Sequence, residues 1–339
     1  MRVLKTNELK TFEQLVSLSQ EEVRKSMAYF LQQKYGKDNV IVSNKYILAT
    51  GDIPIALVAH MDTVFTVPAT NVYYDPKKNV LWSPEGLGAD DRAGVWAIIQ
   101  IINSGRRPHI IFTTDEEKGC IGANALAKYD HPFPELKFLV ELDRQGANDC
   151  VFYDCYNPTF WEYIESFGFV KAWGTFSDIS SLMSAWQICG VNLSVGYEDE
   201  HSYTEILKVG HLLDTIEKVK RLLDEGSWPD FTFEKANVNH LRYLSGWDKY
   251  DLGVDDWYSA GTYEPCVICS GCGHTHKEYD TFPTKGIDGS TKYFCVDCID
   301  GRVDWCSYCE EPFEIDQENP STMCHDCVKE FYARGCSKD

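Results

Sequence analysis

Side chains that can bind metal recur in this sequence where strand-like apolar runs end or where a helix begins. His, Asp and Glu are the nitrogen and oxygen ligands of zinc. Because open α/β sheets bind ligands at the carboxyl ends of their strands, residues that follow several strands can meet at one sheet edge. The pattern therefore predicts a metal-dependent site built from distant segments. The segments are ALVAHMD (56–62), GLGADDRAG (86–94), IIFTTDEEKG (110–119), KFLVELD (137–143) and VNLSVGYEDEH (191–201).

Each motif taken alone also has an ordinary structural interpretation. In HMD (60–62) the carboxylate lies two residues after the imidazole, faces the same way on a strand and can fix its tautomer. The acids of ADD (89–91) would equally cap a helix that follows them. The adjacent acids of EE (116–117) could be solvated loop residues, although a cation would relieve their repulsion. Only the combination is specific.

In this order the motifs resemble the co-catalytic zinc aminopeptidase and carboxypeptidase superfamily, over roughly residues 40–225. The segments AHMDTV, GADDRAG and TTDEEKG carry the resemblance. It implies that Glu116 is the general base, that Asp62 orients the imidazole of HMD, and that the Asp90–Asp91 peptide bond is cis. It also implies a set of metal ligands in which Asp90 bridges both ions. The implied ligands are His60, Asp90, Glu117, Asp143 and His201.

The implied chemistry is hydrolysis of an amide bond with two zinc ions about 3.5–4 Å apart. A water shared by the ions would lose its proton to Glu116, and the resulting hydroxide would attack the amide carbonyl. Glu116 would then return the proton to the leaving amine. We expect an aminopeptidase-like exopeptidase that acts on small peptides or acylated amino compounds. The oxygen-rich ligand set would also accept Co²⁺ or Mn²⁺.

The segment between the last two ligands of the set is short. Only 57 residues separate Asp143 from His201, too few for the lid domain, on the order of 100 residues, that some relatives insert there. The resemblance therefore favours the aminopeptidase-like branch that has no lid, or a trimmed relative. Within this segment, Asp178 is predicted to contact a substrate amine, with helix N-capping as the alternative. Tyr197 is predicted to support the oxyanion, with a packed aromatic as the alternative.

Strand and helix patterns alternate and predict a three-layer α/β/α catalytic domain over residues 1–226, with a mostly parallel sheet. Ser19 and Glu22 form a capping box that would divide the N-terminal helical stretch into two helices. Strands are expected at 40–50, 53–60, 72–83, 109–115, 137–143 and 191–196, and helices at 11–35, 92–105, 122–130, 158–169, 177–186 and 211–226. The strand at 72–83 would be a hairpin across residues 76–79.

Residues 227–264 are rich in aromatic side chains, which predicts an ordered connector that packs on the catalytic domain, with a partner-binding segment as the alternative. Residues 265–339 hold ten of the fourteen cysteines and few apolar runs. They predict a small zinc-ribbon-like C-terminal module that needs metal to fold. CxxC pairs supply tetrahedral zinc sites, and disulfides are the alternative.

Two structural zinc sites are expected in this module. One would take Cys269, Cys272, Cys295 and Cys298, with Cys266, His274 and His276 as alternates. The other would take Cys306, Cys309, Cys324 and Cys327. The sequence resembles tandem zinc ribbons or treble-clef-like knuckles in general. The acidic residues of the module leave two roles for it, recruitment of a protein partner or added stability.

The overall composition narrows the choice of partners and compartment. A formal net charge of −20 argues against nucleic-acid binding, which depends on Lys and Arg neutralising phosphates. No apolar run approaches the roughly 18–20 residues of a membrane span, and the first residues do not resemble a signal peptide. Cysteine-rich metal sites without an export signal favour a reducing cytoplasm. The alternative to an enzyme is a non-catalytic recruitment protein on a peptidase-like scaffold.

Overall fold

The computed structural model describes residues 3–174, 176–235, 266–277, 281–288, 290–295, 298–299, 302–307, 312–316, 323–324 and 327–329. The chain divides into two compact units, residues 1–249 and 250–339. We call them the first and the second unit. Each has its own sheets and its own buried cluster. Three parts with boundaries at residues 226 and 264 were expected. The observed division has one boundary, between residues 249 and 250, so the three-part division stays a prediction.

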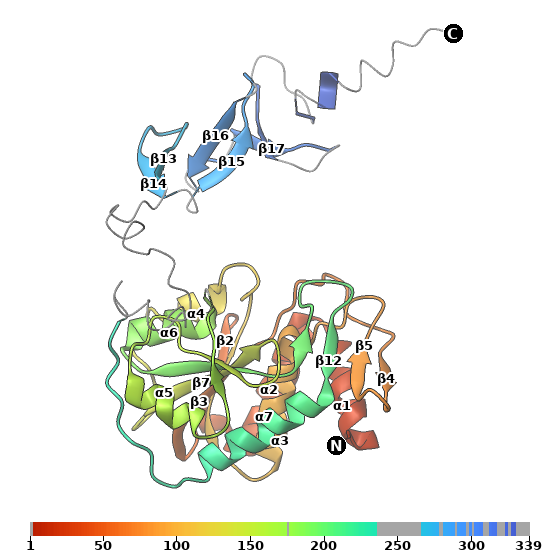
Figure 1. Ribbon diagram of the computed structural model, residues 1–339, viewed down its shortest axis with the longest axis vertical. Coiled ribbons are helices and arrows are strands. Elements are labelled where there is room, and N and C mark those ends of the chain that lie inside the picture. The colour runs from red at the N-terminus through yellow and green to blue at the C-terminus, as the bar shows by residue number, and fades with distance from the viewer. Residues whose placement is uncertain are drawn as a thin grey trace, which may run out of the picture. The chain divides into compact units, whose positions relative to one another are not determined.

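A large mixed sheet forms the centre of the first unit (Figure 1). Its strand order is β1-β2-β6-β3-β7-β10-β8-β9, and the run from β6 to β10 is parallel. All six residues of β6 are buried, as expected for a parallel strand covered on both faces. The strands are β1 (Val40–Val42), β2 (Tyr46–Ala49), β3 (Ile53–His60), β6 (Pro108–Thr113), β7 (Phe138–Arg144), β8 (Asp149–Val151), β9 (Val170–Lys171) and β10 (Gly190–Ser194).

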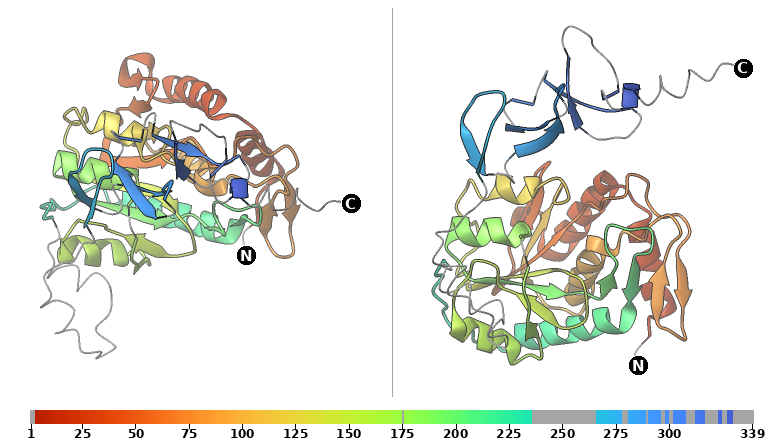
Figure 2. Two further views of the ribbon diagram at one scale, coloured as in Figure 1. Left: turned by 90° about the horizontal axis from the view of Figure 1, so that it is seen from above. Right: turned by 45° about the horizontal axis from the view of Figure 1, so that its top comes forward.

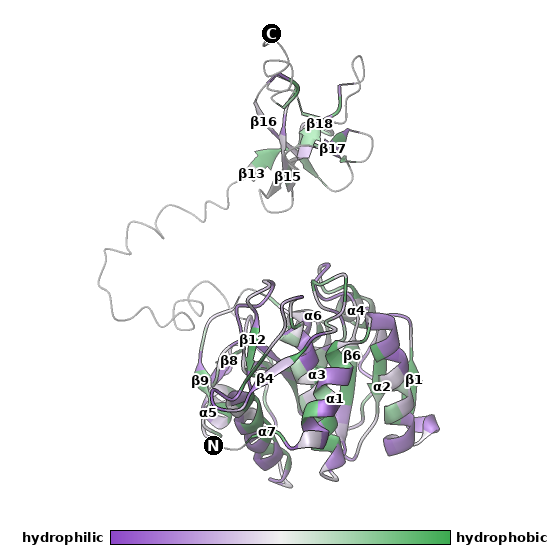
Figure 3. Cartoon of the chain, turned by 90° about the vertical axis from the view of Figure 1, so that its right-hand side faces the viewer, coloured by the Kyte–Doolittle hydropathy of each residue, from purple (hydrophilic) through white to green (hydrophobic). Residues whose placement is uncertain are grey.

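Helices cover both faces of this sheet, with α4 and α6 on one side and α3 and α7 on the other (Figure 1). Helix α3 packs on β3 and β7, whereas α6 packs on β7 and β10. Apolar residues line the strands, and polar residues lie on the outer helix surfaces (Figure 3). The expected three-layer α/β/α architecture is therefore confirmed. The helices are α1 (Thr6–Val16), α2 (Gln20–Tyr35), α3 (Ala89–Asn103), α4 (Ile121–Leu126), α5 (Pro158–Glu165), α6 (Asp178–Trp186) and α7 (Val209–Leu223), with a 3-10 turn, η1 (Lys37–Asn39).

A smaller antiparallel sheet lies at the end of the first unit away from α5 (Figures 1 and 2). Its order is β11-β12-β5-β4. The strands are β4 (Tyr73–Asp75), β5 (Val80–Trp82), β11 (Tyr197–Glu198) and β12 (Ile206–Lys208). The predicted hairpin across residues 76–79 is confirmed, because Asp75 pairs with Val80. The loop between β11 and β12 carries His201 to the edge of the large sheet.

Several predicted elements need correction. The expected strand at 40–50 is two antiparallel strands, because the Ser43 N–H donates to the Tyr46 carbonyl and closes a turn. The helix expected at 122–130 ends at Leu126 and the one at 158–169 ends at Glu165. The short strands β8, β9, β11 and β12 were not predicted, because two or three residues show no periodicity. The capping box at Ser19 and the division into two helices are confirmed.

The described start of the aromatic-rich segment packs on the first unit. Phe233 is buried in its core, and Trp228 and Phe231 pack against that core. The Phe231 ring lies 4.9 Å from the ring of Phe160 on α5. Residues 236–264 lie outside the described part of the chain. No helix in the described part is long and apolar enough to cross a membrane.

The described part of the second unit is built from short strands that pair antiparallel, except that β15 and β18 pair parallel (Figure 1). One hairpin joins β13 (Cys266–Ile268) and β14 (Thr275–Lys277), and a further sheet has the order β16-β15-β18-β17. The strands of that sheet are β15 (Thr281–Lys285), β16 (Thr291–Cys295), β17 (Val303–Trp305) and β18 (Pro312–Glu314). Its buried cluster holds three cysteines and Phe313. Sulfur atoms therefore supply much of the buried apolar material.

Candidate metal centre

The structure brings all five predicted ligand residues together at one edge of the large sheet. Three of them lie at or just after the carboxyl ends of β3, β6 and β7, which are neighbouring parallel strands. The other two come from the first residues of α3 and from the β11–β12 loop. We call this set the metal centre: His60, Asp90, Glu117, Asp143 and His201. The predicted cis peptide bond between Asp90 and Asp91 is also present.

The metal centre consists of two triads that share Asp90. In one triad, His60 Nε2 lies 3.1 Å from Asp90 Oδ1 and 3.6 Å from Asp143 Oδ1. In the other, His201 Nε2 lies 3.2 Å from Asp90 Oδ2 and 3.0 Å from Glu117 Oε2. The two oxygens of Asp90 therefore face different triads, which is the geometry of a bridging carboxylate.

The donor atoms fit a pair of zinc ions. Two ligand atoms that each lie about 2.1 Å from one tetrahedral ion are about 3.4 Å apart, and the nitrogen–oxygen distances in both triads are close to that value. Glu117 Oε1 is buried and has no hydrogen-bond partner among the described residues. A buried carboxylate oxygen without a partner is costly, and a bound cation would satisfy it.

The charges of the metal centre also favour cations. Burial and the neighbouring carboxylates raise the pKa of Asp143 well above its usual range. Burial and Asp90 raise the pKa of Glu117 to about 7. The pKa of His201 is raised to about 9, mainly by its hydrogen bond to Asp90. Without cations, protons would have to offset the crowded negative charge.

Asp62 contacts both a predicted ligand residue and the loop that carries the predicted base. Its Oδ1 lies 3.3 Å from His60 Nδ1, so it can orient the imidazole as expected. The same carboxylate accepts the backbone N–H groups of Glu116 at 3.0 Å and Glu117 at 3.2 Å. Asp62 therefore fixes the position of the loop after β6 relative to the end of β3. The sequence predicted only the first of these contacts.

The two predicted substrate-contacting residues lie inside the protein. Asp178 is 0% exposed, is the first residue of α6 and accepts a hydrogen bond from the Thr113 hydroxyl. Burial raises its pKa to about 7. The N-cap of α6 is Ser177 rather than Asp178. Tyr197 is 3% exposed and donates its hydroxyl to Asp143 Oδ1 at 3.1 Å. Contact of either residue with substrate stays a prediction.

Two buried carboxylates, neither of which was predicted as a site residue, support the metal centre. Glu205 accepts the backbone N–H groups of Ala89 at 3.1 Å and Asp90 at 3.0 Å, so it anchors the N-terminus of α3. Glu141 accepts the Ser177 hydroxyl at 2.7 Å. Burial raises the pKa of Glu205 to about 7. Glu141 could have been noticed in the sequence, because it is an acid inside the apolar run of β7. No sequence pattern indicated Glu205.

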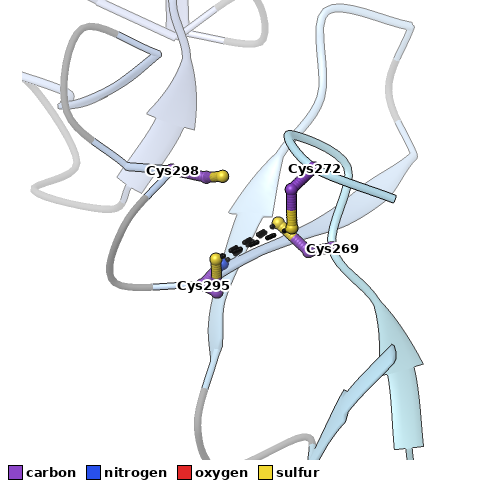
Figure 4. Close-up of side chains that lie close together, drawn as sticks. All are labelled: Cys269, Cys272, Cys295 and Cys298. Carbon is purple, nitrogen blue, oxygen red and sulfur yellow. Dashed lines mark hydrogen bonds between the residues drawn. The ribbon is translucent and has the colours of Figure 1, made fainter. Parts of the chain in front are cut away.

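In the second unit, the first predicted cysteine set is also assembled. The sulfur atoms of its four members lie within 4.8 Å of one another (Figure 4). Cys269 Sγ is 3.6 Å from Cys295 Sγ, close to the roughly 3.8 Å edge of a tetrahedral zinc–thiolate site. Backbone N–H groups overcome the effect of burial and lower the Cys269 pKa to about 6. This cluster contains Cys269, Cys272, Cys295 and Cys298.

The second cysteine set is described in part. Cys306, Cys324 and Cys327 are buried and lie within 4.8 Å of one another, and the Cys324 N–H donates to Cys306 Sγ. The fourth predicted member, Cys309, lies outside the described residues, as do the side chains of Cys266 and His276. The exposed His274 is in neither cluster. Zinc binding by both sets stays a prediction that the sulfur positions support.

Comparisons with known proteins found a family match in sequence and proteins of similar fold. Residues 39–167 match the model of Peptidase family M28. The first unit shares its fold with a tripeptidase from Staphylococcus aureus (15% identity, 65% of this chain and 98% of that chain, TM-score 0.51). It also resembles the aminopeptidase PepT from Bacillus cereus (15% identity, 65% of this chain and 98% of that chain, TM-score 0.50). No curated protein sequence matches the chain.

Proposed function

We propose that this chain, which contains a domain of peptidase family M28, is an aminopeptidase that holds two zinc ions in its first unit. The family match supports a metal-dependent peptidase. The observation that carries the finer proposal is the pair of triads that share Asp90. A single carboxylate with one oxygen in each triad provides for two adjacent ions rather than one.

Two bound zinc ions would polarise the scissile carbonyl and lower the pKa of the attacking water. In the proposed reaction, Glu116 accepts a proton from that water and later donates it to the leaving amine. Asp62 holds the backbone of Glu116 and Glu117 and orients His60, so base and ligands keep one geometry. Removing Asp62 would therefore displace the base and two ligands together.

The surroundings of the metal centre favour a substrate with a free amine. Glu116 adds a carboxylate beside the two triads, and a carboxylate attracts an ammonium group and repels another carboxylate. This supports aminopeptidase rather than carboxypeptidase activity. The described residues between Asp143 and His201 form strands and helices of the first unit, so they place no separate lid domain over a short peptide substrate.

Exposed aromatic residues that lie close in sequence to Ser177 and His201 support a preference for a large apolar side chain. Trp173 and Phe176 are 60% and 63% exposed on the loop that leads to Ser177, whose hydroxyl is 3.1 Å from Asp143 Oδ2. Tyr203, two residues after His201, is 72% exposed. Aromatic surfaces of this kind contact apolar groups favourably. Leucyl and phenylalanyl substrates should therefore be preferred over glycyl ones.

The test uses the full chain and a panel of aminoacyl-p-nitroanilides, with and without 1,10-phenanthroline. Glu116→Gln should keep its zinc, measured by elemental analysis, while turnover falls by about 10²–10⁴-fold. Glu162→Gln, an exposed acid-to-amide change on α5, is the matched control and should keep full turnover. Near-normal turnover of Glu116→Gln would remove the base role. No metal-dependent release from any substrate would favour the recruitment protein.

A further inference from the structure

A third group of ligand-type side chains lies beside the metal centre and shares no residue with its two triads. Glu116, Cys120 and Asp178 each place one donor atom within 4.8 Å of the others. Glu116 and Cys120 lie in the loop after β6, whereas Asp178 begins α6. Two separate segments therefore supply a sulfur atom and two carboxylates to one point.

The geometry of this group is fixed by the backbone. Cys120 Sγ lies 3.5 Å from Glu116 Oε1. The Cys120 N–H donates to the Glu116 carbonyl at 2.8 Å, so the two residues are held at the ends of one tight turn. Cys120 has a left-handed φ of 53°, which ends the turn before α4 begins. The conformation of this loop therefore places the Cys120 sulfur next to the Glu116 carboxylate.

Asp178 provides an independent sign that a ligand belongs here. The residue is 0% exposed, and Cys120 is only 4% exposed. One carboxylate oxygen of Asp178 accepts the Thr113 hydroxyl, but Oδ1 is buried and has no hydrogen-bond partner among the described residues. A buried carboxylate oxygen without a partner is unfavourable. A cation bound by the Asp178 carboxylate, Cys120 and Glu116 would offset the charge of that carboxylate.

We propose that Glu116, Cys120 and Asp178 form a third cation site, which takes one Zn²⁺ ion and inhibits the enzyme when it is filled. A thiolate and two carboxylates provide three ligands of a tetrahedral zinc ion and leave the fourth position to water. The thiolate selects a soft divalent ion over Mg²⁺ or Ca²⁺. Binding releases the Cys120 thiol proton to solvent.

Inhibition follows from the identity of one ligand and rests on the proposed function. A cation on Glu116 occupies the carboxylate that must accept the proton of the attacking water. Excess zinc would therefore stop turnover while the two triads stay filled. Zinc in this site would act on the base and not on the metal centre itself.

The experiment titrates the zinc-loaded full chain with further Zn²⁺. Equilibrium dialysis with radiolabelled zinc counts bound ions, and leucyl-p-nitroanilide hydrolysis is followed in parallel. Cys120→Ala should bind one zinc ion fewer, and its inhibition by zinc is expressed relative to its own turnover without added zinc. Losing only an outer partner costs a metal site about 10–100-fold in affinity, so the inhibitory zinc concentration should rise by at least about 100-fold. Cys150→Ala, another fully buried cysteine, is the matched control and should change neither.

The outcomes separate this site from the proposed function. An equal zinc count and equal inhibition in Cys120→Ala would overturn the site. If Cys120→Ala does not fold, Cys120→Ser replaces it, because a hydroxyl of similar size binds zinc poorly. A cadmium–thiolate absorbance difference between wild type and variant gives a second binding readout. If the wild type hydrolyses nothing, the proposed function and the inhibition fail, whereas the ion count still decides the site.

Discussion

The two units differ in what fills their interior. In the first unit, each strand from β6 to β10 contributes buried apolar side chains to the core. The metal centre lies at the edge of this sheet. In the described part of the second unit, the buried cluster is Cys306, Phe313, Cys324 and Cys327. Small domains with few apolar residues usually need metal or disulfides to fold. The same ion would therefore serve chemistry in one unit and folding in the other.

The largest expected effect is the removal of metal by a strong chelator. The second unit should lose its structure, because structural zinc contributes about 10–16 kcal/mol to small zinc domains. The first unit should stay folded and lose turnover. Amide hydrogen exchange would show full exchange in β15 and β16 and retained protection in β3 and β7. Protection in β16 that survives chelation would contradict the comparison.

A cavity introduced into the core of the first unit should destabilise that unit and leave the cysteine clusters of the second unit unchanged. Leu57 is fully buried in β3. Leu57→Ala should lower the free energy of unfolding of the first unit by about 2–5 kcal/mol, because the surrounding strands cannot close the cavity. Hydrogen exchange measured at increasing urea concentrations would give the free energy of unfolding of each unit separately. Zinc bound by the cysteine clusters should not change, and a shared loss of stability would mean that the units fold as one.

Glu205 tests whether the metal centre depends on its buried support. Glu205→Ala leaves the N–H groups of Ala89 and Asp90 without their acceptor, which costs about 1–3 kcal/mol. Zinc affinity of the first unit should fall about 10–100-fold, measured by competition with a chromophoric chelator. Glu205→Gln, which keeps one acceptor oxygen, should recover part of the affinity. Equal affinities in all three proteins would make Glu205 a purely structural residue.

The smallest expected effect is a pH dependence confined to the first unit. Burial lowers the pKa of His109 from 6.5 to about 4, so the unfolded chain takes up its proton first. Stability from neutral His109 is thus present above pH 6.5 and is lost as pH falls towards 4. His109→Asn keeps an acceptor for the Gly51 N–H but does not titrate. The stability difference between wild type and variant should narrow on acidification, and a constant difference would contradict this.

Much of the fold and of the metal centre could be predicted from local patterns. An apolar strand followed by a ligand residue specifies both its burial and the end at which the ligand lies. This pattern indicated the segments that contain His60, Glu117, Asp143 and His201, and the resemblance assigned the ligand roles, including that of Asp90. Edge strands such as β8 and β9 were missed, because their pairing is set by neighbours rather than by their own periodicity.

The sequence by itself determined which strands are followed by ligand-type residues, because this is a property of short segments. Only the tertiary structure decided what supports and surrounds them. It placed Glu205 against the backbone of Asp90, turned the Tyr197 hydroxyl to Asp143, and joined Cys120 to Asp178. These contacts link segments far apart in the chain, and the buried partner of a carboxylate is set by packing through space, which leaves no periodic signal in sequence.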